Sequence, residues 1–251
     1  MSGRTLVVLQ ARMTSSRLPG KVMMEINGKP MIYWQIQRIL RSKTVNSLVV
    51  ATSIDPSDDA LALFLEKNSI RVYRGALDNV LSRFIEVSER NAHDALIRLT
   101  GDSPLVMPAL IDQMVGAFYE QDVDYLSNTL EPTFPDGLDI EIIKHGVLQN
   151  LYAYNLEPKE LEHVTYGIYT RPETFKLSNF LDESNRSHER WTVDYQEDLD
   201  FVREAYSNFA GYEVTFTYSD MLTFLRQKPD VMSRIDAARR NEQLHEEQNH
   251  A

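Results

Sequence analysis

Residues 5–21 read TLVVLQARMTSSRLPGK. The first six, Thr5–Gln10, form an apolar, β-branched run that predicts a buried strand. The loop that follows carries Arg12, Arg17 and Lys21 together with three hydroxyl residues. In an open parallel sheet, ligands bind beyond the carboxyl ends of the strands. We therefore expect this loop to lie at a ligand site.

The following hundred residues alternate strand-like runs with amphipathic stretches. Strands are expected at 47–52, 70–73 and 95–99, and helices at 31–41, 58–68, 79–91 and 109–120. This alternation is typical of a mostly parallel sheet with helices on both faces. The helix at 58–68 has the clearest local signals, because Asp55 supplies a cap and Pro56 follows at the first helical position. The predicted fold class is α/β.

The rhythm changes after Tyr125. A polar, proline-bearing loop is expected at 128–137, then an alternating strand at 138–143 and a helix at 147–155. Beyond this region we expect a strand at 191–194, a helix at 197–208, a strand at 213–217 and two terminal helices. We interpret residues 1–236 as one domain with an insertion at about 128–169, and residues 237–251 as a polar tail.

Composition excludes several classes of function. The 251 residues include no cysteine and carry a formal net charge of −11. Disulfides, thiolate nucleophiles and Cys-based zinc sites are excluded, so any metal should prefer oxygen or imidazole ligands, which favours Mg²⁺ or Mn²⁺. An acidic surface repels a nucleic-acid backbone, so no nucleic-acid partner is expected. Without an apolar run of about eighteen residues or a signal-peptide pattern, we expect a cytoplasmic chain with no membrane partner.

The charged groups of the first loop match what a triphosphate needs. Arg12 and Arg17 offer planar, fork-shaped donors and Lys21 offers a point charge. The same charges would stabilise a departing pyrophosphate. It is not a Walker loop, because the glycine pattern before the lysine is missing. Spacing alone equally allows a solvated basic loop.

The pattern Ala-Arg-x-x-Ser-x-Arg-Leu-Pro-Gly-Lys at 11–21 resembles the signature loop of the cytidylyltransferases that activate acidic sugars, such as CMP-Kdo and CMP-sialic acid synthetases. The similarity runs from Leu6 to about Tyr206. Residues 74–83, Arg-Gly-x-x-Asp-x-Val-Leu-x-Arg, resemble the spore-coat polysaccharide (SpsF-like) branch, although Asp78 could equally be a helix cap. The resemblance implies a single Rossmann-like, glycosyltransferase-A-like nucleotidyltransferase domain that uses CTP and Mg²⁺ (Mn²⁺ is possible) and forms a homodimer, with the insertion binding the acceptor.

The same resemblance implies which residues bind CTP. Arg12, Lys21 and Asp102 form the implied catalytic set. Thr100 stands where CMP-Kdo enzymes carry a base-reading glutamine, so this residue does not itself indicate cytosine. From their positions, Leu9 and Ala11 could offer backbone groups to the base, and Arg74 and Gly75 could reach its edge. The full set of expected nucleotide contacts is Leu9, Ala11, Arg12, Ser16, Arg17, Lys21, Arg74, Gly75 and Thr100.

Asp102 is the first expected metal ligand. It follows the strand at 95–99 in the segment Gly-Asp-Ser-Pro-Leu, so it lies at the same sheet edge as the first loop. A carboxylate is a natural anchor for a hard cation that bridges phosphate oxygens. By its position alone, Asp102 could instead cap a turn or helix before Pro104.

Asp194 is the second expected metal ligand. It lies in residues 191–199, WTVDYQEDL, which resemble the second signature of the family. Glu197 and Asp198 fall in the first turn of the next helix, where negative charge complements the helix dipole. We expect these two acids to act as capping residues.

Acidic residues are also expected at the acceptor. Asp139 and Glu141 share one face of the alternating strand, and Asp136 precedes them in a turn. The resemblance places an acceptor-contacting acidic motif here, for which Asp136 and Asp139 are the preferred pair, since Glu141 could belong to the wet face of an edge strand. It also implies that His163 or a nearby basic residue pairs with the carboxylate or phosphate of the acceptor, although His163 could simply face solvent. Arg190 is the nearest to Asp194 of the basic residues that precede it, so it could belong to a second anion-binding set for the acceptor.

The expected reaction is transfer of CMP from CTP to an acidic or phosphorylated sugar-like acceptor, with release of pyrophosphate, for surface polysaccharide or glycan biosynthesis. A glycosyltransferase of similar architecture is one alternative. Such enzymes usually hold metal with an Asp-x-Asp pair at a strand end, whereas Asp122 and Asp124 begin a strand and Asp198 and Asp200 lie in a helix. A non-catalytic nucleotide-binding protein is the other alternative, but it would be expected to lack a catalytic carboxylate.

Overall fold

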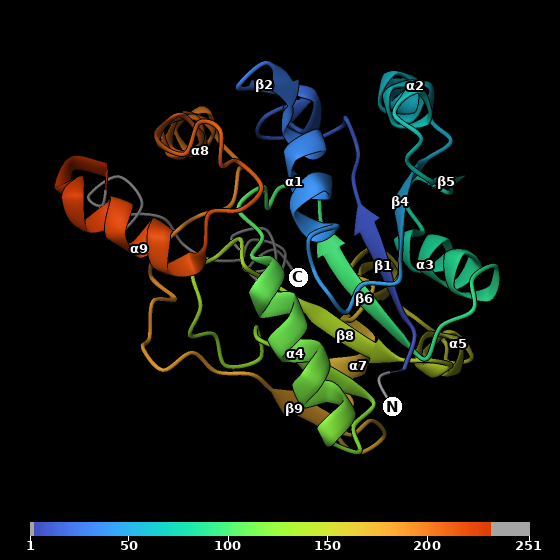
Figure 1. Ribbon diagram of the computed structural model, residues 1–251. Coiled ribbons are helices and arrows are strands. Elements are labelled where there is room, and N and C mark those ends of the chain that lie inside the picture. Colours follow the sequence, from blue (N-terminus) through green and yellow to red (C-terminus); the bar gives the residue numbers. More distant parts are fainter. Residues whose placement is uncertain (1–2, 232–251) are drawn as a thin grey trace.

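The computed structural model describes residues 3–231, which contain a seven-stranded sheet in the order β5-β4-β1-β6-β8-β7-β9 (Figure 1). β1 (Thr5–Gln10) pairs in parallel with β4 (Ser47–Ser53) and β6 (Ala95–Thr100). β5 (Val72–Gly75) continues the parallel set beside β4. The predicted α/β fold with a mixed, mostly parallel sheet is confirmed.

Within the described residues, β8 is the one strand of this sheet that runs against its neighbours. β8 (Glu141–Lys144) pairs antiparallel with both β6 and β7 (Tyr125–Ser127), and β9 (Leu177–Asn179) pairs in parallel with β7. An antiparallel strand begins where its neighbour ends. The acidic segment that leads into β8 therefore arrives at the carboxyl end of β6, which is the edge where the first loop lies.

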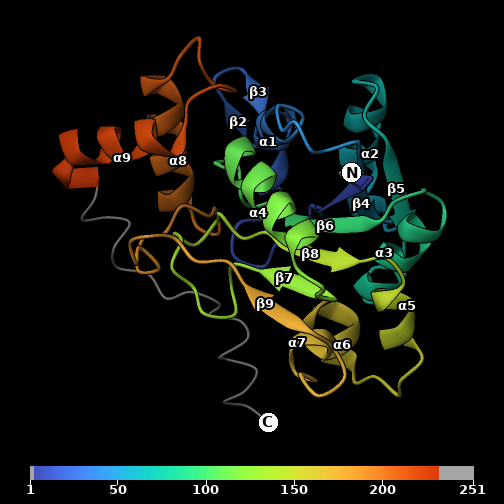
Figure 2. The same cartoon turned by 60° about the horizontal axis from the view of Figure 1, so that its bottom comes forward.

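Helices cover both faces of the sheet (Figures 1 and 2). Side chains alternate along β1, so Val7 and Leu9 pack in one core and Leu6 and Val8 in the other. The helices of the first core are α1 (Met31–Ile39), α2 (Asp59–Lys67), α4 (Pro108–Glu120), α8 (Gln196–Asn208) and α9 (Tyr218–Gln227). Those of the second are α3 (Val80–Glu89), α5 (Val147–Tyr152), α6 (Pro158–Glu162) and α7 (Tyr166–Tyr169).

Short elements beside the first loop were not expected from the sequence. A 3₁₀ turn, η1 (Lys21–Met23), leads into the hairpin of β2 (Glu25–Ile26) and β3 (Lys29–Pro30). Asn27 and Gly28 form its tip with φ of 45° and 74°, the conformation that a two-residue hairpin requires. A second 3₁₀ turn, η2 (Pro56–Asp58), precedes α2.

Two predicted strands are wrong. Residues 191–194 form a loop, because their backbone bonds to the Asp102 loop and not to a strand: the amide of Val193 donates to the carbonyl of Asp102 at 2.8 Å. Residues 213–217 form a turn in which the amide of Phe216 donates to the carbonyl of Tyr212 at 3.0 Å. The guanidinium of Arg38 donates hydrogen bonds to the carbonyl oxygens of Glu213 and Phe216, at 3.0 Å each. These oxygens therefore do not pair with a neighbouring strand.

The remaining boundaries differ in smaller ways. The strand predicted at 138–143 begins only at Glu141, so Asp136 and Asp139 lie in the preceding loop.

No helix among residues 3–231 combines the length and the apolar character needed to cross a membrane. The polar tail at 237–251 lies outside the described residues, as does most of the segment in which a second terminal helix is expected.

Candidate active site

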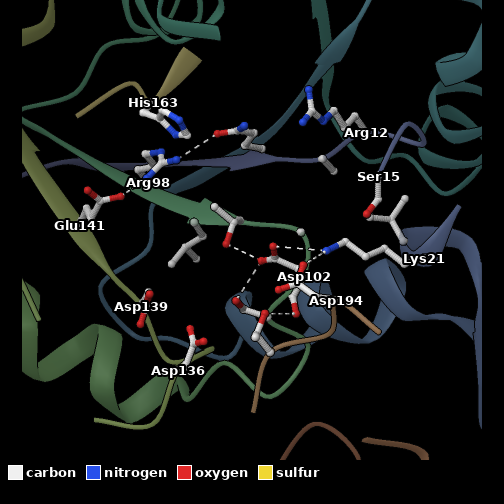
Figure 3. Close-up of a pocket in the computed structure, with 18 of the residues that line it drawn as sticks. Arg12, Ser15, Lys21, Arg98, Asp102, Asp136, Asp139, Glu141, His163 and Asp194 are labelled. Atoms are coloured by element: carbon white, nitrogen blue, oxygen red, sulfur yellow. Dashed lines mark hydrogen bonds and ion pairs between the residues drawn. The ribbon is translucent and has the colours of Figure 1, made fainter. Parts of the chain in front are cut away.

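A cavity of about 300 Å³ lies at the carboxyl ends of β1 and β6 (Figure 3). Its walls come from the first loop, the turn after β6, the loop before β8, the segment between α6 and α7, and the loop before α8. Thirteen of the residues that the sequence assigns to the site line this cavity: Ala11, Arg12, Ser16, Arg17, Lys21, Thr100, Asp102, Asp136, Asp139, Glu141, His163, Arg190 and Asp194.

Three residues expected at the nucleotide lie outside the cavity. Leu9 is buried in the sheet. Arg74 is engaged elsewhere, because its guanidinium donates to the carbonyl of Ser53 at 2.8 Å and to the carboxylate of Asp59 at 2.6 Å. Gly75 ends β5, two strands away from β1. These three residues, which we expected to contact the nucleotide, therefore do not line the cavity.

The first loop is held in place by a residue that the sequence analysis missed. Asp58 is fully buried, and its Oδ1 accepts from the amide of Met13 at 2.7 Å. Its Oδ2 accepts from the amide of Ser53 at 3.0 Å. The loop closes on itself where the amide of Gly20, with φ of 75°, donates to the carbonyl of Met13 at 2.8 Å. With its backbone fixed in this way, the loop carries Arg12 and Lys21 at the cavity (Figure 3).

Lys21 joins the two expected metal ligands. Its ammonium lies 2.9 Å from Oδ1 of Asp194 and 3.5 Å from Oδ2 of Asp102, and it donates to the carbonyl of Val193 at 2.7 Å. Arg17 adds a second cation, with Nη2 2.8 Å from the same Oδ1 of Asp194. The first loop and the loop before α8 are therefore linked through one carboxylate.

Arg190 completes the set of cations around Asp194. Its Nη2 lies 2.7 Å from Oδ2 of Asp194, so both carboxylate oxygens are paired. Burial raises the pKa of the Asp194 carboxyl, but the three cations around it outweigh burial and lower the pKa to about 2. The ring of Tyr195 packs against this group, 5.3 Å from the guanidinium carbon of Arg17 and 5.8 Å from that of Arg190.

Asp102 is oriented by its neighbours in the turn after β6. Thr100 Oγ1 donates to its Oδ1 at 2.6 Å and Ser103 Oγ at 3.2 Å, which leaves Oδ2 toward Lys21. Glycine at position 101 allows a close approach to the first loop, because a Cβ there would lie 3.0 Å from the Cβ of Ala11 and 3.1 Å from the carbonyl oxygen of Gln10. The close approach brings Asp102 beside the first loop.

The donor set around Lys21 suits a hard divalent cation. Asp102 and Asp194 present carboxylate oxygens to one shared positive charge. Among the described residues, no group of three or more His, Cys, Asp or Glu side chains could hold a metal. Mg²⁺ typically takes one or two carboxylates and completes its shell with water and substrate phosphates. Two aspartates beside a cluster of arginine and lysine side chains fit that pattern.

Glu141 forms an ion pair with Arg98 that the sequence analysis does not predict. Its Oε2 pairs with Nη1 of Arg98, and its Oε1 accepts from the hydroxyls of Tyr125 at 2.6 Å and Thr165 at 2.5 Å. Only 9% of its side chain is exposed, because β8 lies between β6 and β7. The interpretation of Glu141 as the wet face of an edge strand is therefore wrong. Burial lowers the pKa of Arg98, but the charge of Glu141 outweighs burial and raises it.

Asp136 and Asp139 lie on the wall below the expected metal ligands (Figure 3). Oδ2 of Asp136 is 3.3 Å from Nη1 of Arg190, and the two backbones form a β-bridge. Gly137 permits this approach, since its φ is 102° and a Cβ would lie 2.5 Å from the amide nitrogen of Thr192. His163 lines the cavity on the same side as Arg98, as Figure 3 shows.

The Asp-x-Asp pair that a glycosyltransferase would need is engaged elsewhere. Asp122 and Asp124 precede β7, whose amino end faces away from the carboxyl ends of β1 and β6. Asp122 pairs with Lys176 at 2.6 Å and with Lys144 at 3.4 Å. The second Asp-x-Asp sequence, Asp198 and Asp200, lies in α8, as expected.

Comparison with curated proteins gives two informative relatives. The chain is 33% identical over 240 residues to the spore coat polysaccharide biosynthesis protein SpsF of Bacillus subtilis (strain 168), covering 92% of this chain and 98% of that protein. It is also 33% identical over 154 residues to 3-deoxy-manno-octulosonate cytidylyltransferase of Geobacter sulfurreducens, covering 59% of each.

Solved structures share the fold. A cytidylyltransferase from Leptospira borgpetersenii superposes with a TM-score of 0.87 at 28% identity, covering 95% of this chain and 99% of that one. CMP:2-keto-3-deoxy-manno-octonic acid synthetase in complex with CTP superposes with a TM-score of 0.65 at 20% identity, covering 82% and 99%. The profile of the Cytidylyltransferase family matches residues 6–223. Because this match spans most of the chain and includes every cavity residue described above, the chain belongs to the cytidylyltransferase family, as a nucleotidyltransferase of the CMP-sugar synthetase type.

Proposed function

We propose that this protein uses Mg²⁺ to transfer CMP from CTP to an acidic or phosphorylated sugar-like acceptor, releasing pyrophosphate. The observation that carries the proposal is the convergence of Arg17, Lys21 and Arg190 on Asp194, beside Asp102, at the carboxyl ends of β1 and β6. This edge is where open α/β sheets bind ligands. The group combines cations for a triphosphate with carboxylates for its metal.

The first loop would bind the triphosphate. Arg12 and Arg17 can each grip phosphate oxygens through two N–H groups, and the hydroxyl of Ser16 can donate a hydrogen bond. Lys21 would move from the carboxylates to the β- and γ-phosphates and stabilise the charge of the leaving pyrophosphate. The protein would then act mainly by positioning and charge stabilisation, with no covalent intermediate.

Asp102 and Asp194 would hold Mg²⁺, and Mn²⁺ suits the same oxygen ligands. When bound there, the ion supplies positive charge to the α-phosphate oxygens. Thr100 and Ser103 keep Asp102 oriented for this role through their hydrogen bonds to its Oδ1. Thr100 thus supports the metal ligand and does not read the base in this proposal.

The acceptor would lie between the two sides of the cavity. Asp136 and Asp139 can accept hydrogen bonds from acceptor hydroxyls, while Arg98 and His163 favour an anionic group on the opposite side. The relation to SpsF supports a role in surface polysaccharide or glycan biosynthesis. We further propose a cytoplasmic homodimer that associates through residues 128–169, on the basis of the family resemblance.

The test is to identify the product. The protein would be incubated with CTP, Mg²⁺ and a pooled panel of sugar acids and sugar phosphates, and the mixture analysed by mass spectrometry. We expect an acceptor whose mass has gained one CMP unit, and a loss of that product in Asp102→Asn protein that still folds. Activity retained by Asp102→Asn would refute the role of Asp102. Hydrolysis of a nucleotide-sugar without pyrophosphate release would favour the glycosyltransferase alternative.

A further inference from the structure

Asp198 contacts the backbone of the proposed metal ligand Asp194. One of its carboxylate oxygens, Oδ2, accepts from the amide of Asp194 at 2.8 Å and from the amide of Tyr195 at 2.9 Å. Asp198 is the third residue of α8, and its contact with the amide of Tyr195 is part of a capping box. Capping, which the sequence predicts for this residue, accounts for these two bonds.

A second set of contacts is not explained by capping. Asp198 also binds Arg190 through both oxygens, with Oδ1 3.1 Å from Nε and Oδ2 3.3 Å from Nη2. The same guanidinium reaches Asp194 at 2.7 Å and Asp136 at 3.3 Å. Only 4% of the Arg190 side chain is exposed. Burial lowers the pKa of Arg190, but these carboxylates outweigh burial and raise it, so the buried group stays charged.

These contacts determine which oxygen of Asp194 faces the cavity. Arg190 binds Oδ2 and is itself fixed by Asp198, so Oδ1 is the oxygen presented to Lys21 and Asp102. We infer that Asp198 is a positioning residue for the metal: it aligns Asp194 through Arg190 and through the Asp194 amide. The inference rests on the proposed function, in which Asp194 holds Mg²⁺.

Charge gives Asp198 a second effect on the same site. Arg190 pairs with three carboxylates, those of Asp136, Asp194 and Asp198. If the negative charge of Asp198 were removed, the positive charge of Arg190 would be less compensated. It would then offset more of the negative charge of Asp194 and weaken the attraction of Asp194 for a cation. Residues that orient metal ligands from behind typically change metal affinity by roughly ten- to a hundredfold when they are replaced.

Asp198→Asn is the decisive variant, because asparagine keeps the shape and can still accept a backbone hydrogen bond in the first turn. Asp200→Asn is the matched control: it removes the same charge from the same helix, but the Asp200 side chain is 53% exposed and pairs with Arg203. Mn²⁺ binding to each protein, with and without CTP, would be measured by electron paramagnetic resonance, together with thermal melting and the Mg²⁺ dependence of pyrophosphate release.

We expect Asp198→Asn to weaken Mn²⁺ binding about tenfold or more and to raise the Mg²⁺ activation constant by a similar factor. Asp200→Asn should change both by less than about twofold, since an exposed charge is well screened. If Asp198→Asn does not fold at the assay temperature, Arg190→Lys, which loses the forked contact but keeps the charge, should weaken Mn²⁺ binding in the same way.

The outcomes separate this inference from the function on which it rests. A folded Asp198→Asn protein with wild-type Mn²⁺ affinity would overturn the positioning role and leave the proposed function intact. If Asp198→Asn does not fold and Arg190→Lys is used in its place, wild-type Mn²⁺ affinity in Arg190→Lys would likewise overturn the positioning role. A wild-type protein that binds no Mn²⁺ either with or without CTP would overturn the metal assignment in the proposed function, and the inference with it.

Discussion

Lys21 and Asp194 are separated by 173 positions in the chain, yet Nζ of Lys21 lies 2.9 Å from Oδ1 of Asp194. The same ammonium lies 3.5 Å from Asp102. Lys21 therefore neutralises the two carboxylates that we assign to the metal. We expect Lys21 and a divalent cation to compete for these oxygens until a nucleotide offers phosphates to the lysine.

This competition predicts opposite effects for Lys21→Met on binding and on turnover. Without nucleotide, Mn²⁺ should bind several-fold more tightly, because a cation that competes for both carboxylates is gone. With CTP and acceptor, kcat should fall by about a hundredfold or more, as when a charge-stabilising donor is removed. Lys29→Met, at the exposed first residue of β3, is the control and should leave both unchanged. Weaker Mn²⁺ binding in Lys21→Met would contradict the competition.

The ionisation of Asp194 should make the fold sensitive to acid. Its pKa falls from 3.8 to about 2 on folding, so its charge stabilises the folded state above pH 4, by about 2 kcal/mol. That contribution should be lost as the pH falls from about 4 to about 2, because both states then bind the proton. Urea unfolding of the wild type and of Asp194→Asn would measure it. The difference in unfolding free energy should shrink between pH 5 and pH 3, and a constant difference over this range would argue against the ion pairs.

The Arg98–Glu141 pair should separate stability from acceptor binding. Glu141→Gln leaves Arg98 buried without its counter-charge, which should cost about 3 kcal/mol in unfolding free energy. The variant with both Glu141→Gln and Arg98→Met removes the uncompensated charge and should recover most of that loss. If Arg98 faces the anionic group of the acceptor, the acceptor KM should stay raised in the double variant while the KM for CTP changes little. Full recovery of the acceptor KM would assign Arg98 a purely structural role.

Sequence patterns predicted the sheet because its central strands are buried on both faces. β1, β4 and β6 read as mostly apolar runs, and such runs flanked by helical periodicity are typical of parallel strands. The hairpin between β2 and β3 was missed although Asn27-Gly28 is a strong signal for a two-residue turn. Its strands have only two residues each, too few for an alternating pattern to register.

The errors concern contacts between distant segments. Residues 213–217 resemble a strand locally, but Arg38, 175 positions before Glu213, binds their carbonyls and holds a turn. The wet face expected for Glu141 depended on an edge strand, and β7 covers that edge. In the sequence, Arg98 is a charged residue within an otherwise apolar strand. Its ion pair with Glu141 could not be predicted, because it depends on β8 pairing with β6 so that Glu141 lies opposite Arg98. Asp58 reads as the start of a helix until its bond to Met13 is seen.

In the proposed function, the cations and carboxylates at this sheet edge process CTP. The most direct measurement is Mg²⁺-dependent pyrophosphate release from CTP, UTP, ATP and GTP, each supplied with the same pooled acceptors. We predict release from CTP that depends on both Mg²⁺ and the acceptor pool, with at most traces from the other three nucleotides. Release from another nucleotide in preference to CTP, or release from CTP that persists without a divalent cation, would contradict the account.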